Sequence, residues 1–183
     1  MLNATISKMI LNALTKGQSG SSPSITRDAF LALLTTLPGD SGTGGVEVSA
    51  TTMKGYSRLK LGSEGVSNKS LDGKDFFNTS GAVWNDGKKA YVVENQANMQ
   101  MSAIEENVTE SAVVKGFAIC KTISSALSAT EMLAWGPLVD TSGNATTVTL
   151  TGGSAPIFYY NSDSTKDNKG DFVLMLGSAS TSA

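Results

Sequence analysis

The stretch Val113–Leu138 (VVKGFAICKTISSALSATEMLAWGPL) is the most apolar part of the sequence, and it constrains the fold more than any other. Val113–Ile123 carries apolar side chains on both sides at period two, which predicts a core strand covered on both faces. These side chains are Val113, Phe117 and Ile119 on one side, and Val114, Ala118 and Cys120 on the other. A second strand is predicted over Glu131–Leu138, where Gly136-Pro137 ends the ladder because proline has no N–H to donate. Neither strand carries a group that does chemistry, so the stretch indicates an architecture rather than a reaction.

The composition is typical of one domain built from short strands and many turns. Only 16% of the 183 residues are charged and 19 are glycine, with Ser and Thr abundant. The net charge of −2 and the lack of a basic block argue against nucleic acid as a partner. A single cysteine, Cys120, cannot form an internal disulfide and is expected to be an inert core thiol. Lys8 interrupts the candidate secretory segment and no window spans a membrane, so we expect a soluble protein made in a cytoplasm.

The sequence contains no histidine, which excludes Ser-His-Asp and Cys-His hydrolases and every histidine-containing metal site. Glutamates cluster at Glu105, Glu106 and Glu110, but adjacent residues on an extended chain point opposite ways, which favours an exposed acidic turn. The segment Asn161–Asp171 lacks the order of acidic residues of a calcium loop and fits a hairpin loop better. We therefore expect no catalytic residue, no metal site and no cofactor, and do not expect an enzyme.

Residues 1–17 are predicted to form an amphipathic helix. Its apolar stripe is Ile6, Met9, Ile10, Ala13 and Leu14. A helix this short must dock its apolar face, either on its own domain or on a neighbouring subunit, and the Gly/Ser-rich linker Gln18–Ser24 permits both. The predicted assembly interface is Ile6, Met9, Ile10 and Leu14. The expected organisation is an anchor of residues 1–24, a β-domain of residues 25–177 and a frayed tail of residues 178–183.

Further strands are predicted along the chain from alternation and turn signals. The exception is Ala29–Thr35, where the apolar run fits neither period cleanly and a strand is chosen partly on the resemblance described below. The predicted strands are Ala29–Thr35 (for which a helix is the alternative), Val46–Val48, Tyr56–Leu61, Ala82–Trp84 paired with Lys88–Val93 through Asn85-Asp86-Gly87, Asn95–Met101, Ala145–Thr151, and a final pair Ile157–Tyr160 and Phe172–Leu176. In Tyr56–Leu61 the alternation predicts a solvated face of Tyr56, Arg58 and Lys60. The two cations, with Lys54 nearby, serve solubility or, alternatively, bind an anion or a sialylated glycan.

Several stretches, in order, resemble a family of bacteriophage virion proteins labelled tail fibre or head fibre (decoration) proteins. They are the N-terminal ATISKMILNAL, a strand ending in LLTTLP, Gly55-Tyr56-Ser57-Arg58-Leu59, which is similar to the family's G-Y-x-R pattern, VVKGFAIC and LAWGPL. The likeness extends from about Asn3 to Tyr160. It implies an antiparallel, jelly-roll-like β-sandwich present as a repeated copy in a phage particle, with no catalytic residues to carry over. Gly62–Asn78 and Asn161–Asp171 depart from the family as local elaborations.

The function expected from the resemblance and the residues together is a virion structural protein: a fibre, collar or decoration subunit. Such a homo-oligomeric subunit would attach to capsid, collar or tail proteins in a virion assembled in the host cytoplasm. The alternative is a carbohydrate-binding module that recognises host surface glycans, with Tyr56, Trp84 and Tyr91 stacking on sugar rings. A glycan-degrading enzyme is disfavoured, because the sequence offers no carboxylate pair at a suitable separation.

Overall fold

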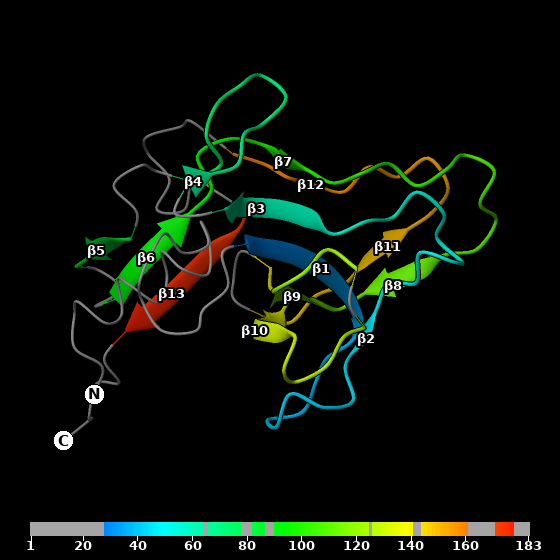
Figure 1. Ribbon diagram of the computed structural model, residues 1–183, viewed down its shortest axis with the longest axis horizontal. Helices are drawn as coiled ribbons and strands as arrows, with labels where there is room; N and C mark the ends of the chain where they lie inside the picture. The colour runs from blue at the N-terminus through cyan, green and yellow to red at the C-terminus, as the bar shows by residue number, and fades with distance from the viewer. Residues whose placement is uncertain are drawn as a thin grey trace. The chain divides into compact units, whose positions relative to one another are not determined.

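The computed structural model describes residues 28–63, 66–77, 82–86, 90–124, 126–140, 144–160 and 171–177 (Figure 1). Within these ranges the protein is mainly β, with antiparallel sheets and no α-helix, which confirms the predicted class. The strands are β1 (Asp28–Thr36), β2 (Val46–Glu47), β3 (Leu59–Ser63), β4 (Val66–Ser67), β5 (Val83–Asn85), β6 (Ala90–Glu94), β7 (Met99–Gln100), β8 (Ala112–Val114), β9 (Gly116–Cys120), β10 (Met132–Pro137), β11 (Val148–Leu150), β12 (Ile157–Phe158) and β13 (Val173–Gly177). The predicted N-terminal helix, its linker and the tail of residues 178–183 lie outside the described residues.

The described chain divides into two compact units, and each is assembled from segments that are distant in sequence. The first unit contains Asp28, Leu61–Met99 and the described residues from Phe158 onward. The second unit contains Ala29–Lys60 and Gln100–Ile157. The predicted domain of residues 25–177 includes the described parts of both.

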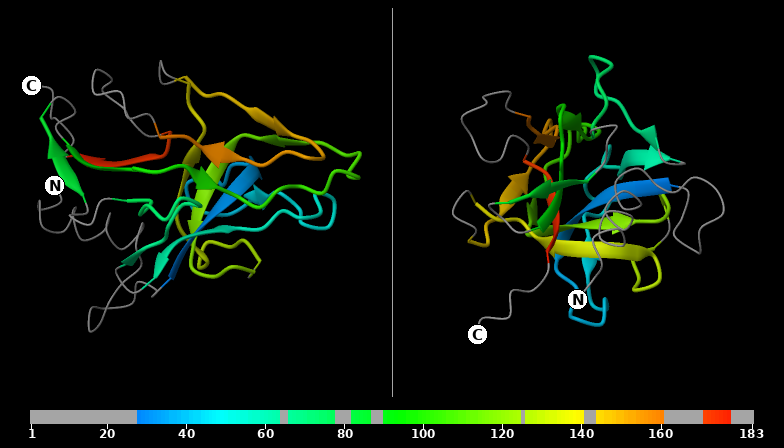
Figure 2. Two further views of the ribbon diagram at one scale, coloured as in Figure 1. Left: turned by 90° about the horizontal axis from the view of Figure 1, so that it is seen from above. Right: turned by 90° about the vertical axis from the view of Figure 1, so that its left-hand side faces the viewer.

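The second unit is organised around β1, which pairs with β9 on one side; in the strand order β10-β9-β1-β3, β9 also pairs with β10. Figure 2 shows these strands alongside one another. Six consecutive residues of β1, Ala29–Leu34, are buried. Alanine and leucine favour helix, but a segment with sheet neighbours and both faces covered is stabilised as a strand by burial and pairing. The choice of a strand for Ala29–Thr35 is confirmed.

The predicted strand Val113–Ile123 is two strands in the structure, β8 and β9, separated at Lys115. In β9 the residues Ala118, Ile119 and Cys120 are fully buried, as expected for a core strand. Val113 in β8 is exposed, so the prediction that both faces are covered fails there, because β8 pairs with β11 in a separate two-stranded sheet. The predicted strand Glu131–Leu138 is confirmed as β10.

Gly116 marks the point where β9 begins, and a larger residue does not fit there. A Cβ at this position would lie 2.3 Å from Cδ2 of Leu37 and 2.4 Å from the carbonyl oxygen of Gly136 on β10. Close approach of backbones is a usual reason for glycine in a strand. The core cluster beside it consists of Phe30, Ala32, Leu34, Ala118, Cys120 and Met132, with Leu37, Leu127 and Trp135 packed against it.

In the first unit, β5 and β6 form the predicted hairpin, with Trp84 opposite Tyr91 and Asn85 opposite Ala90. The turn residues 87–89 lie outside the described residues. Phe76 and Phe77, the two aromatics of an otherwise polar stretch, are buried. The two strands predicted at the end of the chain are present as β12 and β13, but the prediction that they pair with each other is wrong. β13 pairs with β6 and β12 pairs with β7. The loop Asn161–Asp171 expected between them falls outside the described residues up to position 170.

Candidate functional site

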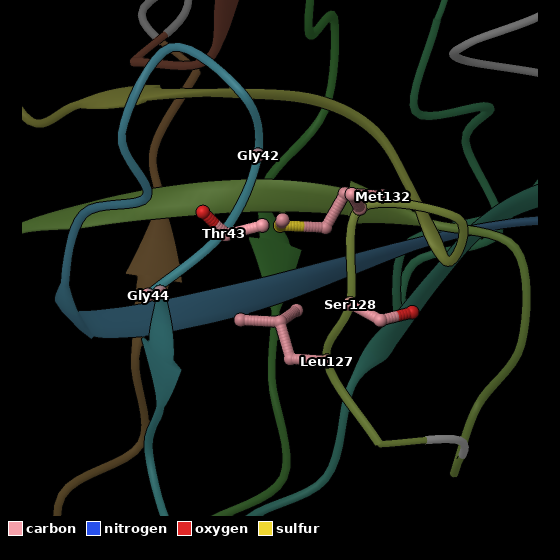
Figure 3. Close-up of a pocket in the computed structure, with 8 residues that line it drawn as sticks. Gly42, Thr43, Gly44, Leu127, Ser128 and Met132 are labelled. Carbon is pink, nitrogen blue, oxygen red and sulfur yellow. The ribbon is translucent and has the colours of Figure 1, made fainter.

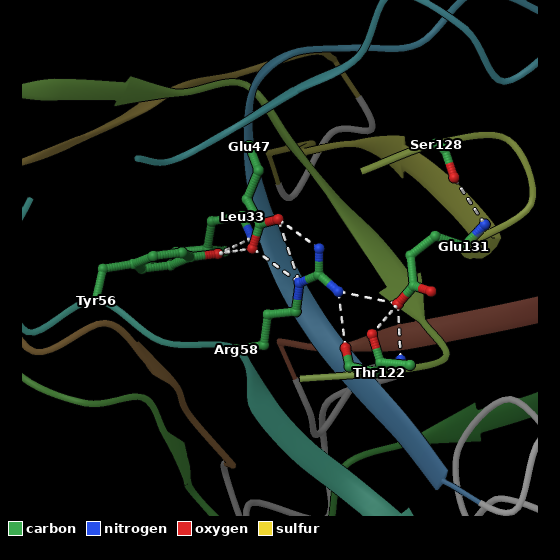
Figure 4. A network of polar contacts seen from close by, with 7 residues as sticks. All are labelled: Leu33, Glu47, Tyr56, Arg58, Thr122, Ser128 and Glu131. Atoms are coloured by element: carbon green, nitrogen blue, oxygen red, sulfur yellow. Dashed lines mark hydrogen bonds and ion pairs between the residues drawn. The ribbon is translucent and has the colours of Figure 1, made fainter. Parts of the chain in front are cut away.

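An ionic cluster in the second unit is formed by Glu47, Tyr56, Arg58, Thr122 and Glu131, of which Tyr56, Arg58 and Glu131 are buried (Figure 4). We call it the Arg58 cluster. The guanidinium donates from Nη2 to Glu47 Oε2 at 2.7 Å and from Nε to both Glu47 oxygens at 3.0 and 3.2 Å. Its Nη1 donates to the carbonyl oxygen of Thr122 at 2.7 Å and to Glu131 Oε1 at 3.0 Å. One cation therefore joins β2, the start of β3 and the loop between β9 and β10.

The other members of the cluster hold the two carboxylates in place. Glu131 Oε1 also accepts hydrogen bonds from the backbone N–H of Thr122 at 2.7 Å and from its hydroxyl at 2.8 Å. Tyr56 donates its hydroxyl to Glu47 Oε1 at 3.0 Å and accepts the backbone N–H of Leu33 at 2.9 Å. The phenol thus connects the carboxylate to the central strand β1.

The electrostatics keep Tyr56 and Arg58 in fixed protonation states. Burial, followed by the charge of Glu47, raises the pKa of the Tyr56 hydroxyl above its ordinary value, so the phenol stays neutral. For Arg58, burial opposes the charge, but the hydrogen bond to Glu47 and the nearby carboxylates outweigh it and raise the pKa. A permanently charged guanidinium between two carboxylates fits a structural role, because its N–H groups already donate to Glu47, Glu131 and the Thr122 carbonyl.

The predicted solvated face of Tyr56–Leu61 is wrong for its first half. Tyr56 is 7% exposed and Arg58 is 5% exposed, and β3 begins only at Leu59. Alternation predicted an outward direction, but the two glutamates and the Thr122 carbonyl that satisfy Arg58 come from distant positions that a local pattern does not reveal. An anion site based on Arg58 is not supported by this geometry, and Lys60 instead lies with its Nζ 6.0 Å from the Phe30 ring centroid.

The residues proposed to contact glycans fall in different environments. Tyr56 is buried in the Arg58 cluster, whereas Trp84 on β5 is 42% exposed and Tyr91 on β6 is half-buried. The Trp84 and Tyr91 rings are 5.3 Å apart between centroids, with an angle of 65° between their planes. Trp84 Nε1 donates to Asp86 Oδ1 at 2.8 Å. The two rings form an edge contact with each other and present no common plane for a sugar.

A pocket of about 260 Å³ opens in the second unit between the loop that follows β1 and the loop that precedes β10 (Figure 3). It is lined by Gly42, Thr43, Gly44, Gly45, Leu127, Ser128, Ala129 and Met132. In Figure 3 the side chain of Met132 extends toward Thr43 of the opposite loop. Met132 belongs to the core cluster and Leu127 packs on it, so the floor of the pocket is apolar.

A shallower groove of about 410 Å³ lies elsewhere in the second unit. Its lining residues are Thr35, Val46, Glu47, Ser49, Thr52, Ser111, Ala112, Val113 and Lys115. Its apolar side chains are Val46, Ala112 and Val113, and the two valines are exposed. It combines hydroxyl groups and apolar surface with two ionisable groups, Lys115 and Glu47, of which Glu47 is bonded to Arg58.

Asn95 in the first unit is a buried polar residue that sequence reasoning missed. Its Nδ2 lies 3.0 to 3.2 Å from the carbonyl oxygens of Ala97, Phe158 and Tyr159, and its Oδ1 accepts the N–H of Phe172 at 3.0 Å. The side chain therefore ties the end of β6 to segments more than sixty positions away. Sequence reasoning also missed Glu47 and Glu131 as members of a site. Glu47 stands between Val46 and Val48, which is the one local signal that could have found it.

Other predicted features are tested only in part. The proposed assembly residues Ile6, Met9, Ile10 and Leu14 lie outside the described residues. Among the residues that the structure describes, no three His, Cys, Asp or Glu side chains are grouped as metal ligands would be. No helix in the described ranges has the length and apolar character needed to cross a membrane.

Comparison of the sequence with models of known protein families gave no match, and comparison with curated proteins gave none either.

Proposed function

We propose that this chain is a structural protein of a bacteriophage particle, a fibre, collar or decoration subunit that self-associates and attaches to other virion proteins. The sequence resemblance suggests the particle, and the β-rich architecture supports a structural role. The finer description of the fold as a jelly-roll-like antiparallel β-sandwich is part of this proposal.

The observation that carries the proposal is the Arg58 cluster. Carboxylates, a tyrosine and an arginine gathered in one place are groups that an enzyme uses, but here each is bonded to another member of the cluster. Both carboxylates share one guanidinium, so neither is poised to exchange a proton with a substrate. The ionic side chains of the cluster therefore connect strands and loops to one another, and such connections are what a rigid structural subunit requires.

Exposed apolar side chains support assembly rather than isolation. Large apolar residues that are at least two-fifths exposed occur in both units: Val46, Val66, Leu71, Val83, Trp84, Val113, Ile123, Val139, Val148 and Tyr159. Single exposed apolar residues are normal on a protein surface, but Val46 and Val113 share one groove. A subunit that packs against copies or neighbours would cover such surface.

The test is to purify particles of the phage that encodes the chain and to search them by quantitative mass spectrometry and immunogold labelling. We expect the protein at a fixed stoichiometry in intact particles. Replacing Met9 and Ile10 of the predicted anchor by Asp should abolish incorporation while the purified variant keeps its β-type circular dichroism. Absence of the wild-type chain from particles would contradict the proposed function, whereas normal incorporation of the variant would contradict only the anchor.

A carbohydrate-binding role is the second candidate, and the exposed Trp84 is the observation that favours it. One exposed indole can stack on one sugar ring. A glycan array probed with the wild-type protein and with Trp84→Ala distinguishes the two functions. Binding that disappears in the variant would support recognition of a host glycan, and no binding by either protein would leave the structural role as the better description.

A further inference from the structure

The shallow groove of about 410 Å³ in the second unit, which we call the Lys115 groove, opens where two sheets diverge. The ladder of β1 and β9 ends at the pair Leu34–Gly116, and Lys115 N donates to the carbonyl oxygen of Leu34 at 2.8 Å. The end of β1 then pairs with β2, whereas β8 pairs with β11 in another sheet. Side chains from both parts line the space between them, and its volume is within the range of about 300–1,000 Å³ that is usual for small-ligand sites.

Three groups in the lining of the groove can only accept a hydrogen bond from a ligand. The Thr35 hydroxyl donates its proton to the carbonyl oxygen of Val46 at 3.2 Å. The Thr52 hydroxyl donates its proton to the carbonyl oxygen of Ser49 at 3.3 Å. Each hydroxyl has one proton, so only its lone pairs remain for a ligand, and the partly exposed carboxylate of Glu47 has no proton to give. A ligand must therefore bring its own O–H or N–H groups, which a fully ionised inorganic anion lacks.

Two other groups in the lining supply donors. Ser49 Oγ accepts the backbone N–H groups of Thr51 and Thr52 at 3.2 and 3.4 Å, which leaves its proton for a ligand oxygen. Lys115 is exposed, and its ammonium carries three N–H donors. The Glu47 carboxylate is paired with Arg58 at 2.7 Å, so Lys115 is the cation of the groove that an anionic group on a ligand would meet.

Apolar surface lies in the same groove as these polar groups. Val46 is 51% exposed and Val113 is 43% exposed. A sugar ring carries C–H groups on its faces and hydroxyl groups around its rim, and each hydroxyl both donates and accepts. Such a ring can donate to the acceptors of the groove while its C–H groups cover a valine. A carboxylate on the sugar adds a charge-assisted hydrogen bond from Lys115.

We propose that the Lys115 groove binds an acidic saccharide, a sugar that carries a carboxylate, such as a hexuronate or a sialate. This binding site goes beyond the structural role proposed above, and it is separate from Trp84, which lies in the first unit. The ligand, rather than a neighbouring subunit, then covers Val46 and Val113. The other exposed apolar side chains remain available for assembly.

The experiment measures binding of the full chain to arrayed oligosaccharides that carry hexuronate or sialate, each beside its neutral counterpart. Isothermal titration calorimetry then follows with the acidic oligosaccharide that binds best. We expect the wild-type protein to bind an acidic oligosaccharide and not its neutral counterpart. Lys115→Met keeps the aliphatic stem but removes the charge, so it should weaken binding about tenfold or more. Lys54→Met, at an exposed lysine of the same unit outside the groove lining, should bind as the wild type does.

A second pair of variants tests the groove itself. Val113→Asp places a carboxylate in the lining and should abolish binding by repelling the ligand. Val148→Asp is its matched control, because Val148 is 51% exposed on the partner strand β11 and does not line the groove. Added salt should weaken binding by the wild type, and Lys115→Met should lose most of this salt dependence. Circular dichroism and urea midpoints verify the fold of each variant, and Lys115→Gln replaces Lys115→Met if the latter unfolds.

Three results would overturn the inference: no binding to any acidic oligosaccharide on the array, equal binding to the neutral counterparts, or binding that survives both Lys115→Met and Val113→Asp. Binding lost in Trp84→Ala but kept in Lys115→Met would also overturn it, because the saccharide would then lie in the first unit. None of these results bears on whether phage particles contain the chain, so the groove and the proposed function fail separately.

Discussion

Replacing Arg58 by Met is the perturbation that most directly tests how the second unit is held together. It leaves two carboxylates without the guanidinium that lies 2.7 Å from Glu47 and 3.0 Å from Glu131. Breaking a buried ion pair by removing one partner costs about 3–5 kcal/mol. Glu131 keeps its two bonds from Thr122, and Glu47 keeps Tyr56 and is partly exposed, so we expect about 3 kcal/mol. That is a large fraction of the roughly 5–15 kcal/mol that stabilises a typical domain.

The assay uses the two tryptophans, because one lies in each unit. In a Trp84→Phe background, urea unfolding followed by fluorescence reports Trp135, which packs against the core cluster of the second unit. Arg58→Met should lower the midpoint of this transition. The triple variant Arg58→Met, Glu47→Gln, Glu131→Gln should recover more than half of the loss, since no buried charge then lacks a partner. A loss below about 1 kcal/mol for the single variant would refute the reasoning, because exposed pairs have that value.

Three further changes test other features. Gly55→Ala should lower the free energy of unfolding by about 2–4 kcal/mol, since Gly55 has a φ of 90° and a Cβ there would lie 2.4 Å from a backbone oxygen. Gly44 has a φ of 77° and open space around it, so Gly44→Ala should lower it by only about 1–2 kcal/mol. The urea midpoints of the two variants should differ accordingly. Asn95→Ala should lower the free energy of unfolding by about 2–3 kcal/mol, because it leaves buried backbone groups without a hydrogen bond. Thermal unfolding followed through Trp84 fluorescence would measure the loss. Unchanged stability would mean that water replaces the amide. Burial raises the pKa of the Cys120 thiol from its ordinary value of 9.0 to about 12. Between pH 9 and 12 the folded state therefore keeps a proton that the unfolded state loses. The free energy of unfolding should fall by up to about 1.4 kcal/mol per pH unit in this range. Below pH 9 both states are protonated and no such slope is expected; an equal alkaline slope in Cys120→Ala would contradict this assignment.

Local patterns predicted the strands whose neighbours are close in sequence or whose faces are uniformly apolar. Tyr91 pairs across a short connection with Trp84, so the Asx-Gly signal sufficed for that hairpin. The apolar run of β1 fits neither the helical nor the strand period, and its alanines and leucines favour helix, so the prediction of a strand there depended partly on the family resemblance; burial on both faces decides its conformation. Alternation failed at Arg58, where tertiary partners turned a residue expected in solvent inward.

The candidate site was the least predictable part of the protein. Glu47 and Glu131 lie 11 and 73 positions from Arg58 in the sequence, and each of the three looks like an ordinary surface charge in its own segment. Nothing local distinguishes Glu131, which is buried, from Glu106, which is exposed. The difference arises from the loop between β9 and β10, where the N–H and hydroxyl of Thr122 hold the carboxylate. Which distant charged residues meet in the fold is decided by how the strands are connected, and a local sequence pattern does not contain that information.

The interleaving of the two units has a consequence for synthesis. The second unit needs residues up to Ile157, and in the first unit β6 waits for β13, which ends at Gly177. A ribosome that has released the first hundred residues has therefore completed neither unit. Nascent chains must stay unassembled until Gly177 has been synthesised, and a premature stop anywhere before β13 leaves β6 paired with β5 on one side and open on the other. Exposed strand edges of that kind invite aggregation, so the interval between the synthesis of β6 and that of β13 is when the chain is most exposed to it.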